Sequence, residues 1–322
     1  MLTLNRIRAL KPWHGIVFFI VVMLVFFFIC VPIQRWFGLY GLAITELILL
    51  IMALLFAKLM RYPFKILFPI RKPHGLHLLG IFLIWISVYL LDMVAMLIQY
   101  RLFPEQMYAV NSGLNEVIYS LPFVISMFIV AVMPAICEEA VHRGVIIHTL
   151  YTVKREWVVV LIMGIYFGLF HADPFRFLPT AVLGAAISYI MLETENILYA
   201  AFFHFINNLL PSLYSEFIMW LYPEEMLQQP EMMKIPLVTI GIYMIFALIA
   251  PFGIYLGNYL LHHVPGLRRP FIDNKKTVST ILKIAIPTAI LVISGFLLMV
   301  VGFLFDPVTA DILKEAMEIT GY

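Results

Sequence analysis

The chain has 322 residues, of which 63% are hydrophobic and only 12% are charged. Soluble domains carry about 25% charged residues, so this composition excludes an ordinary soluble protein and predicts a polytopic membrane protein. The formal net charge of +2 does not indicate a nucleic-acid partner, and the two cysteines provide no disulfide framework.

Nine apolar stretches approach the length of about 20 residues that a membrane-spanning helix needs. They cover about 14–33, 38–59, 76–98, 119–151, 157–172, 176–192, 196–221, 236–261 and 279–304. The stretches 157–172 and 176–192 are short, which is typical of tilted or incomplete spans. We therefore expect an all-α fold: a polytopic transmembrane bundle of eight to nine helices with a polar intramembrane cavity.

Lysine and arginine residues are distributed unevenly between the two sets of loops that join these helices. With a cytoplasmic N-terminus, fourteen of them face the cytoplasm and five face the other side, which agrees with the positive-inside rule. The cytoplasmic set is Arg6, Arg8, Lys11, Lys58, Arg61, Lys65, Arg71, Lys72, Lys154, Arg155, Arg268, Arg269, Lys275 and Lys276; the opposite set is Arg35, Arg101, Arg176, Lys234 and Lys314. We expect an integral protein of a prokaryotic plasma membrane with its N-terminus in the cytoplasm.

Two adjacent acids, Glu138 and Glu139, interrupt the apolar segment 117–151, and His142 and Arg143 follow on the next turn. A charged side chain at the bilayer centre costs about 2.5–3.5 kcal/mol, so this cluster is a candidate functional site. Glu139 and Arg143 are spaced i,i+4 and are predicted to form an ion pair, which leaves Glu138 free to face a cavity. In the alternative, Glu138 also pairs with His142 and both pairs only stabilise helix packing.

Later apolar stretches carry two further polar features. His171 follows Phe167 by four residues, and His204 precedes Asn208 by four, so His204 and Asn208 share one helix face. Glu138 lies 17 residues before Arg155 and His171 lies 16 after it, so on antiparallel helices both would lie about 25 Å from that turn. Glu138 and His171 are therefore expected at the same depth.

In this order, Glu138-Glu139-x-x-x-Arg143, Phe167-x-x-x-His171 and His204-x-x-x-Asn208 resemble the three signatures of the CAAX protease and bacteriocin-processing (Abi) family. This family includes the type II CAAX prenyl endopeptidases. The resemblance covers about 117–215 and divides the chain into accessory helices (1–116), a catalytic core (117–221), and C-terminal helices with a tail (222–322).

The resemblance implies an intramembrane glutamate-type endopeptidase that needs no cofactor. Its catalytic residues would be Glu138, His171, His204 and Asn208: the first two activate a water molecule and the last two bind the oxyanion. Glu139, Arg143 and Phe167 would support them. The expected partners are the lipid bilayer and a peptide or membrane-protein substrate, lipidated substrates included; the sequence does not indicate an oligomeric state.

Three alternatives remain open at this stage. Glu138, His171 and His204 could instead ligate zinc as a His₂Glu metallopeptidase site, although the His-Glu-x-x-His signature is absent. The same buried charges could serve a proton-coupled transporter, which matched broken helices in two halves would indicate. The third alternative is a non-catalytic scaffold or immunity protein.

Overall fold

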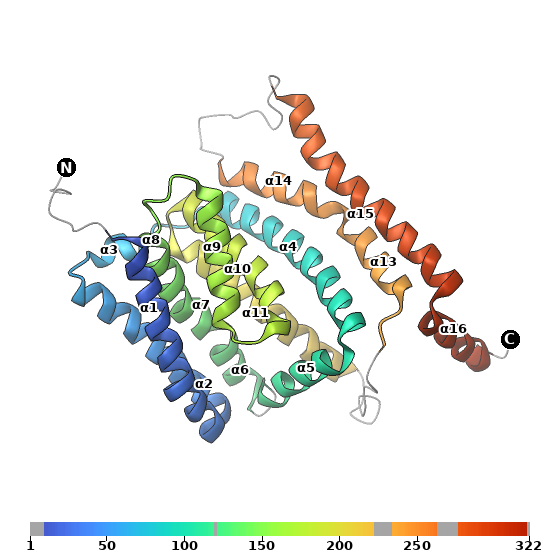
Figure 1. The fold of residues 1–322 in the computed structure, drawn as a ribbon, viewed down its shortest axis with the longest axis horizontal. Helices are drawn as coiled ribbons and strands as arrows, with labels where there is room; N and C mark the ends of the chain where they lie inside the picture. Colours follow the sequence, from blue (N-terminus) through green and yellow to red (C-terminus); the bar gives the residue numbers. More distant parts are fainter. Residues whose placement is uncertain (1–9, 119–120, 222–233, 263–275, 321–322) are drawn as a thin grey trace. The chain divides into compact units, whose positions relative to one another are not determined.

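The computed structural model describes residues 10–118, 121–221, 234–262 and 276–320, and within these ranges the chain is helical and contains no strand (Figure 1). The predicted all-α class is thereby confirmed. Five basic residues of the orientation count, Arg6, Arg8, Arg268, Arg269 and Lys275, lie outside the described residues. So do residues 119–120 at the start of the predicted span 119–151.

The helices follow one another with short connections. In chain order they are α1 (Pro12–Val25), η2 (Phe26–Cys30), α2 (Val31–Leu59), α3 (Phe64–Leu67), α4 (Gly75–Leu102), α5 (Pro104–Ile118), α6 (Phe123–Met127), η3 (Phe128–Val132), α7 (Met133–Glu139), η4 (Ala140–Ile146), α8 (Ile147–Thr149), α9 (Glu156–Phe170), α10 (Pro174–Thr194), α11 (Ile197–Leu221), α13 (Leu237–Phe246), η5 (Ala247–Ile249), α14 (Ala250–Leu261), α15 (Thr277–Phe305) and α16 (Pro307–Thr320). The segments η2, η3 and η4 are π-helical.

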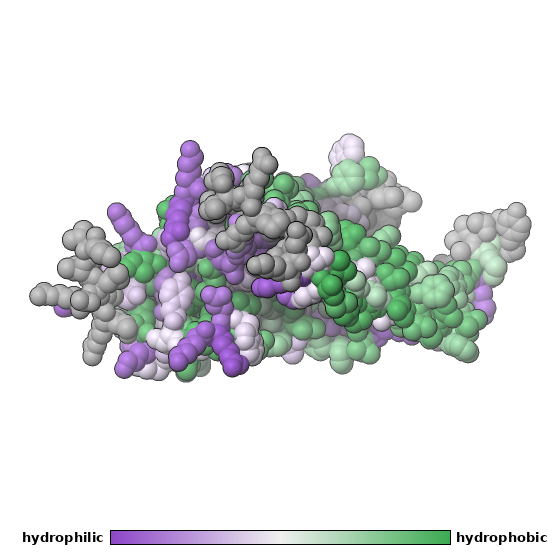
Figure 2. Space-filling model, turned by 90° about the horizontal axis from the view of Figure 1, so that it is seen from above, coloured by the Kyte–Doolittle hydropathy of each residue, from purple (hydrophilic) through white to green (hydrophobic). Residues whose placement is uncertain are grey.

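Six helical segments are long and apolar enough to cross a membrane. They are Pro12–Leu59, Gly75–Leu102, Phe123–Thr149, Pro174–Thr194, Leu237–Leu261 and Thr277–Phe305. Large apolar side chains cover much of the outer surface, which Figure 2 shows as extensive green areas, and soluble proteins rarely expose apolar patches of this extent. Together these features support an integral membrane protein, while the count of eight to nine spans stays a prediction.

The 48-residue segment Pro12–Leu59 folds back on itself. Gly38 has φ 55° and ψ −128°, a conformation that glycine adopts without steric cost. The Gln34 amide then donates to the Thr45 hydroxyl at 2.9 Å, although eleven residues of straight helix would separate them by about 16 Å. A Cβ atom on Gly41 would lie 2.5 Å from the Ile33 carbonyl oxygen, so glycine permits this close return.

The chain divides into two compact units. The first, here called the motif unit, joins the chain up to Pro73 to the segment from Ser112 through α11. The second joins His74–Asn111 to helices α13 to α16. The predicted division at 116 and 221 follows the family resemblance rather than spatial contacts, and it stays a prediction.

Within the motif unit, α7 packs between α2 and α11, and α9 and α10 form a closely packed antiparallel pair. Small residues permit this close approach, as they commonly do between membrane helices. Gly184 on α10 lies directly against the Phe167 side chain of α9, and a Cβ atom on Gly164 would lie 2.7 Å from the Ala181 carbonyl oxygen.

A tight turn connects α9 to α10. Ala172 adopts a left-handed conformation with φ 53°, and the Asp173 carboxylate caps α10 by accepting from the backbone N–H groups of Phe175 and Arg176. This turn places His171 at the end of α9 and Arg176 in the first turn of α10.

Candidate active site

The adjacent acids lie at the end of α7, between two π-helical stretches. Both residues are buried, with Glu138 8% exposed and Glu139 fully inaccessible. Pi-bulges occur mostly as single turns within α-helices and are frequent at functional sites. The backbone of residues 128–146, here called the motif segment, is therefore irregular on both sides of the two carboxylates.

Glu139 and Arg143 form the ion pair that their spacing predicted. The Arg143 guanidinium donates to Glu139 Oε1 at 2.9 Å, and neither side chain is exposed. It also donates to the Gly184 carbonyl at 2.7 Å and to the Ser188 hydroxyl at 3.2 Å, and it lies 4.7 Å from the centre of the Phe167 ring. Arg143 thus ties the motif segment to α9 and α10.

Glu139 also holds His204, which lies 65 residues further along the chain. Nδ1 of His204 lies 2.8 Å from Glu139 Oε1, and because this carboxylate accepts from Arg143 as well, Nδ1 is the donor. The opposite ring nitrogen, Nε2, lies 4.0 Å from Glu138 Oε2. His204 therefore turns its Nε2 atom toward Glu138.

His142 does not form a second ion pair with the Glu138 side chain. Its Nδ1 atom lies 2.9 Å from the Glu138 backbone carbonyl oxygen, and its ring packs edge-on against Phe167 and Phe170. Glu138 Oε2 has no hydrogen-bond partner among the described residues. The alternative of two purely structural ion pairs is therefore wrong.

His171 has one ring nitrogen fixed by the backbone. Nδ1 donates to the Phe167 carbonyl at 2.9 Å, one helical turn earlier, and the ring packs edge-on against Phe167. The other nitrogen, Nε2, remains available to a ligand.

Asn208 pairs with the carbonyl of Val130, which lies in the π-helical stretch η3 just before Pro134. Because proline has no N–H, residue 134 cannot donate to this carbonyl as it would in a regular α-helix. The Asn208 amide donates to that carbonyl at 3.0 Å, and its oxygen accepts from Asn207 at 3.4 Å. Asn208 thereby joins α11 to the irregular part of the motif segment.

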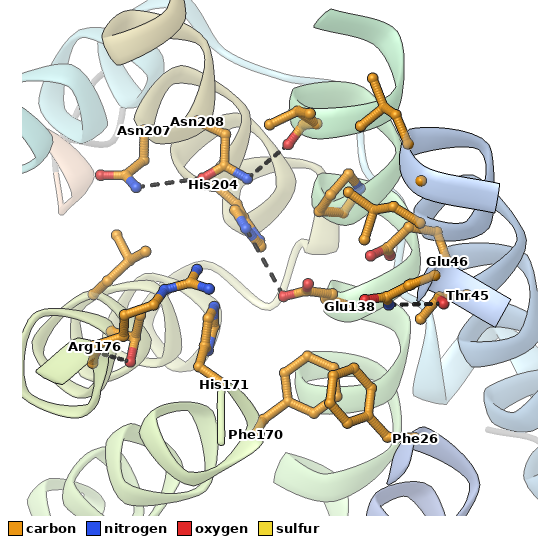
Figure 3. A pocket seen from close by; sticks show the side chains of 18 residues that line it. Phe26, Thr45, Glu46, Glu138, Phe170, His171, Arg176, His204, Asn207 and Asn208 are labelled. Atoms are coloured by element: carbon orange, nitrogen blue, oxygen red, sulfur yellow. Dashed lines mark hydrogen bonds and ion pairs between the residues drawn. The ribbon is translucent and has the colours of Figure 1, made fainter. Parts of the chain in front are cut away.

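The four predicted catalytic residues lie around one cavity of about 380 Å³ within the motif unit (Figure 3). Glu138, His171, His204 and Asn208 all line it. Glu139, Arg143 and Phe167 are fully buried outside the cavity lining: Glu139 contacts His204, Phe167 packs against His171, and Arg143 pairs with Glu139. The three motifs therefore converge in space, although 70 residues of chain separate Glu138 from Asn208.

Two charged residues of the cavity escaped the sequence reasoning. Glu46 on α2 is 2% exposed, and its Oε2 atom has no hydrogen-bond partner in the described part of the chain. Arg176, counted above as a loop residue, lies in α10 and lines the cavity opposite Glu46 (Figure 3). Glu46 could have been found as an ionisable residue inside the predicted span 38–59. Arg176 had no comparable signal, because it lies at the edge of the predicted span 176–192.

A metal site was the alternative for Glu138, His171 and His204. In the described ranges, no three histidine, cysteine or acidic side chains are grouped so that they could hold one metal ion. Nδ1 of His171 and Nδ1 of His204 each contact a protein acceptor, which leaves one nitrogen on each ring for a ligand, an arrangement that is also usual for metal-binding histidines.

Residues 120–210 match the family model described as type II CAAX prenyl endopeptidase Rce1-like. This range contains every predicted site residue, and the match confirms the resemblance that the three motifs indicated. No curated protein and no solved structure matches the chain. The matched family is a family of proteases, which supports a hydrolase that acts on peptides.

Proposed function

We propose, from the match of residues 120–210 to the type II CAAX prenyl endopeptidase Rce1-like family, that this protein is an intramembrane endopeptidase. Its substrate would be a membrane-associated peptide, prenylated near its C-terminus. One observation carries the proposal: the buried Glu138 carboxylate faces a cavity with one oxygen unpartnered among the described residues, and the Nε2 atom of His204 lies 4.0 Å away.

In this proposal Glu138 is the general base. A water molecule held between Glu138 and His171 gives a proton to Glu138 while its oxygen bonds to the scissile carbonyl carbon. General-base help of this kind typically accelerates a reaction by about 10²–10⁴-fold. The proton then passes to the amide nitrogen as the C–N bond breaks, which releases an amine and a new carboxyl terminus.

His204 and Asn208 would stabilise the oxyanion that forms on the carbonyl oxygen. The contact between Nδ1 of His204 and Glu139 fixes the imidazole ring and turns Nε2 toward Glu138. Because Nδ1 already carries one proton, Nε2 can donate to the oxyanion only when the ring is protonated on both nitrogens. The Asn208 amide uses one N–H on Val130 and has a second one to offer. Losing one such donor typically costs about 2.7–4 kcal/mol of transition-state stabilisation.

The decisive experiment is a cleavage assay with the full chain in liposomes, comparing the wild type with Glu138→Gln. Prenylated and unprenylated peptide pools are each incubated with and without a strong zinc chelator. We expect the wild type alone to cleave the prenylated peptides, with no effect of the chelator.

Each other outcome supports a different alternative. Cleavage that the chelator abolishes would indicate that Glu138, His171 and His204 bind zinc. Equal cleavage by the wild type and Glu138→Gln would show that Glu138 is not the general base. A Glu138→Gln protein that retains its full biological effect in cells would instead favour the scaffold or transporter alternative.

A further inference from the structure

Arg176 is a cation of the cavity that the proposed chemistry does not use. It is half-buried in the first turn of α10, and Figure 3 shows its side chain directed into the cavity, toward His171 and His204. Its backbone N–H and carbonyl are both bonded, to Asp173 and Thr180 respectively. Its guanidinium, in contrast, makes no hydrogen bond or ion pair with any residue that the structure describes.

The nearby carboxylates do not compensate this charge by direct contact. Asp173 and Glu138 influence Arg176 only through longer-range electrostatics. The Asp173 carboxylate accepts from two backbone N–H groups as the cap of α10, and Glu139 is shared between Arg143 and His204. A guanidinium with five N–H donors in a cavity requires an acceptor, and a carboxylate matches its planar fork.

The surroundings of Arg176 favour a negative ligand at this end of the cavity. The N-terminus of α10, a 21-residue helix, carries a partial positive charge and Arg176 adds a full one, and the Asp173 carboxylate that caps the helix offsets part of this sum. The Glu46 carboxylate lies on the other side of the cavity, and Glu138 lies between Glu46 and Arg176 (Figure 3). A negative peptide terminus would therefore be attracted toward Arg176 and repelled by Glu46.

We propose that Arg176 binds the C-terminal carboxylate of the substrate, which rests on the proposed function. With the carboxylate held at Arg176, a peptide that ends in a free carboxylate would bind more tightly than the same peptide with an amidated end. A cavity of about 380 Å³ lies at the small end of the range for ligand sites, which suits the end of a peptide.

The test measures binding, so that it does not depend on cleavage. A farnesylated hexapeptide is prepared in two forms, with a free C-terminal carboxylate and with a C-terminal amide. Each is titrated against the full-length Glu138→Gln protein in nanodiscs, alone and combined with Arg176→Gln, Arg176→Lys or Arg35→Gln. Arg35 is exposed and does not line the cavity, so its replacement controls for the loss of one positive charge.

We expect the peptide with a free carboxylate to bind at least about tenfold more tightly than the amidated peptide when Arg176 is present. In Arg176→Gln the two affinities should differ by less than about twofold. Arg176→Lys should give an intermediate ratio because it keeps the charge but loses the fork, and Arg35→Gln should leave the ratio unchanged. Equal binding of acid and amide to the protein that retains Arg176, or no binding of either, would overturn the proposal, and this comparison needs no substitution at Arg176. A preference for the acid that persists in Arg176→Gln would also overturn it.

Cleavage by the otherwise wild-type protein separates the two proposals. If the peptide with a free carboxylate binds preferentially but is not cleaved, the proposed endopeptidase activity is rejected and the carboxylate site is retained. Cleavage of acid and amide at equal rates, with equal binding, would retain the endopeptidase and reject the carboxylate site.

Discussion

Glu138 and Glu139 are adjacent in the chain, yet their carboxyl groups have opposite surroundings. Glu139 accepts from Arg143 and His204 in a fully buried network. Glu138 lines a cavity, and its Oε2 atom has no partner in the described chain. Because a buried polar group without a partner costs stability, Glu138 is better explained by function than by folding.

Substitution of each acid by glutamine, which has nearly the same shape, should distinguish the structural role of Glu139 from the functional role of Glu138. Glu139→Gln leaves the Arg143 charge buried without a counter-charge, and we expect a loss of about 3–5 kcal/mol in the free energy of unfolding. Glu138→Gln removes a poorly compensated charge, so its melting temperature should equal or exceed that of the wild type. Thermal unfolding of both variants in the same detergent checks this, and equal destabilisation would contradict the assignment.

Asp306, in the second unit, is a buried carboxylate with a structural role. It follows α15 directly and accepts from Arg101 at 2.7 Å and from the Leu237 N–H and the Thr309 hydroxyl, both at 2.9 Å. Burial alone would raise the pKa of this carboxyl, but the hydrogen bonds from Leu237, Thr309 and Arg101 outweigh burial and lower the pKa below its usual value. Asp306 thereby joins α4, α13, α15 and α16.

A lowered pKa predicts a defined dependence of stability on pH. The carboxylate contributes its full stabilisation above the unfolded pKa of about 3.9, and this contribution is lost as the pH falls through the lower pKa of the folded state. At pH 7, Asp306→Asn should be less stable than the wild type by about 1–3 kcal/mol, because buried donors lose their acceptor.

Melting temperatures of both proteins from pH 7 to pH 3 provide the measurement. The difference between them should stay constant above about pH 5 and shrink at lower pH, where the wild type also loses the charge. A difference that grows on acidification would show that Asp306 is not stabilised as a carboxylate.

At the scale of elements, the α9–α10 pair determines where His171 and Arg176 lie. A Cβ atom on Gly184 would overlap the Cβ of Phe167, which is close to the backbone and has little freedom to move. The two helices must then separate, which would shift the turn between them and the residues at its ends.

We therefore expect Gly184→Ala to destabilise the protein by about 1–3 kcal/mol and to reduce cleavage. The matched control is Gly113→Ala in α5, where the added methyl group meets no atom within 4 Å. Alanine there should be neutral or stabilising by up to about 1 kcal/mol, since it favours helix. Equal effects of the two substitutions on thermal unfolding would argue against close packing of α9 on α10.

At the scale of the whole molecule, the charges at the two ends of α2 predict its direction across the membrane. Arg35 alone lies just before the reversal at Gly38, whereas Lys58, Arg61 and Lys65 gather at the other end of the helix, near Leu59. The 21 residues from Gly38 to Leu59 correspond to about 32 Å, close to the thickness of a bilayer core.

Labelling with a membrane-impermeant maleimide tests the cytoplasmic N-terminus. In intact cells Arg35→Cys should react and Lys65→Cys should not, because the positive-inside rule places Lys65 in the cytoplasm. Lys65→Cys should react after permeabilisation. Both positions are exposed, whereas the native Cys30 and Cys137 are buried and should add little background. The opposite pattern in intact cells would invert the orientation.

Local patterns were sufficient for much of the fold and for part of the site. The lengths of the apolar stretches predicted helices that the structure contains, because the bilayer and the rise of a helix together set that length. The i,i+4 spacing of Glu139 and Arg143 predicted their ion pair, since residues one turn apart are neighbours on any helix. The ordered motifs also indicated the family whose model residues 120–210 match.

Contacts between distant segments depended on how the helices pack, which no local spacing encodes. Glu139 joins His204 across 65 residues, Asn208 donates to the Val130 carbonyl, and Glu46 and Arg176 enter the cavity from different helices. Residue spacing determines which side chains share a face of one helix, whereas the rotation and depth of each helix depend on its neighbours. For that reason the two acids and the Glu139–Arg143 pair could be predicted from the sequence, but the contact of Glu139 with His204 and the presence of Glu46 and Arg176 in the cavity required the tertiary structure.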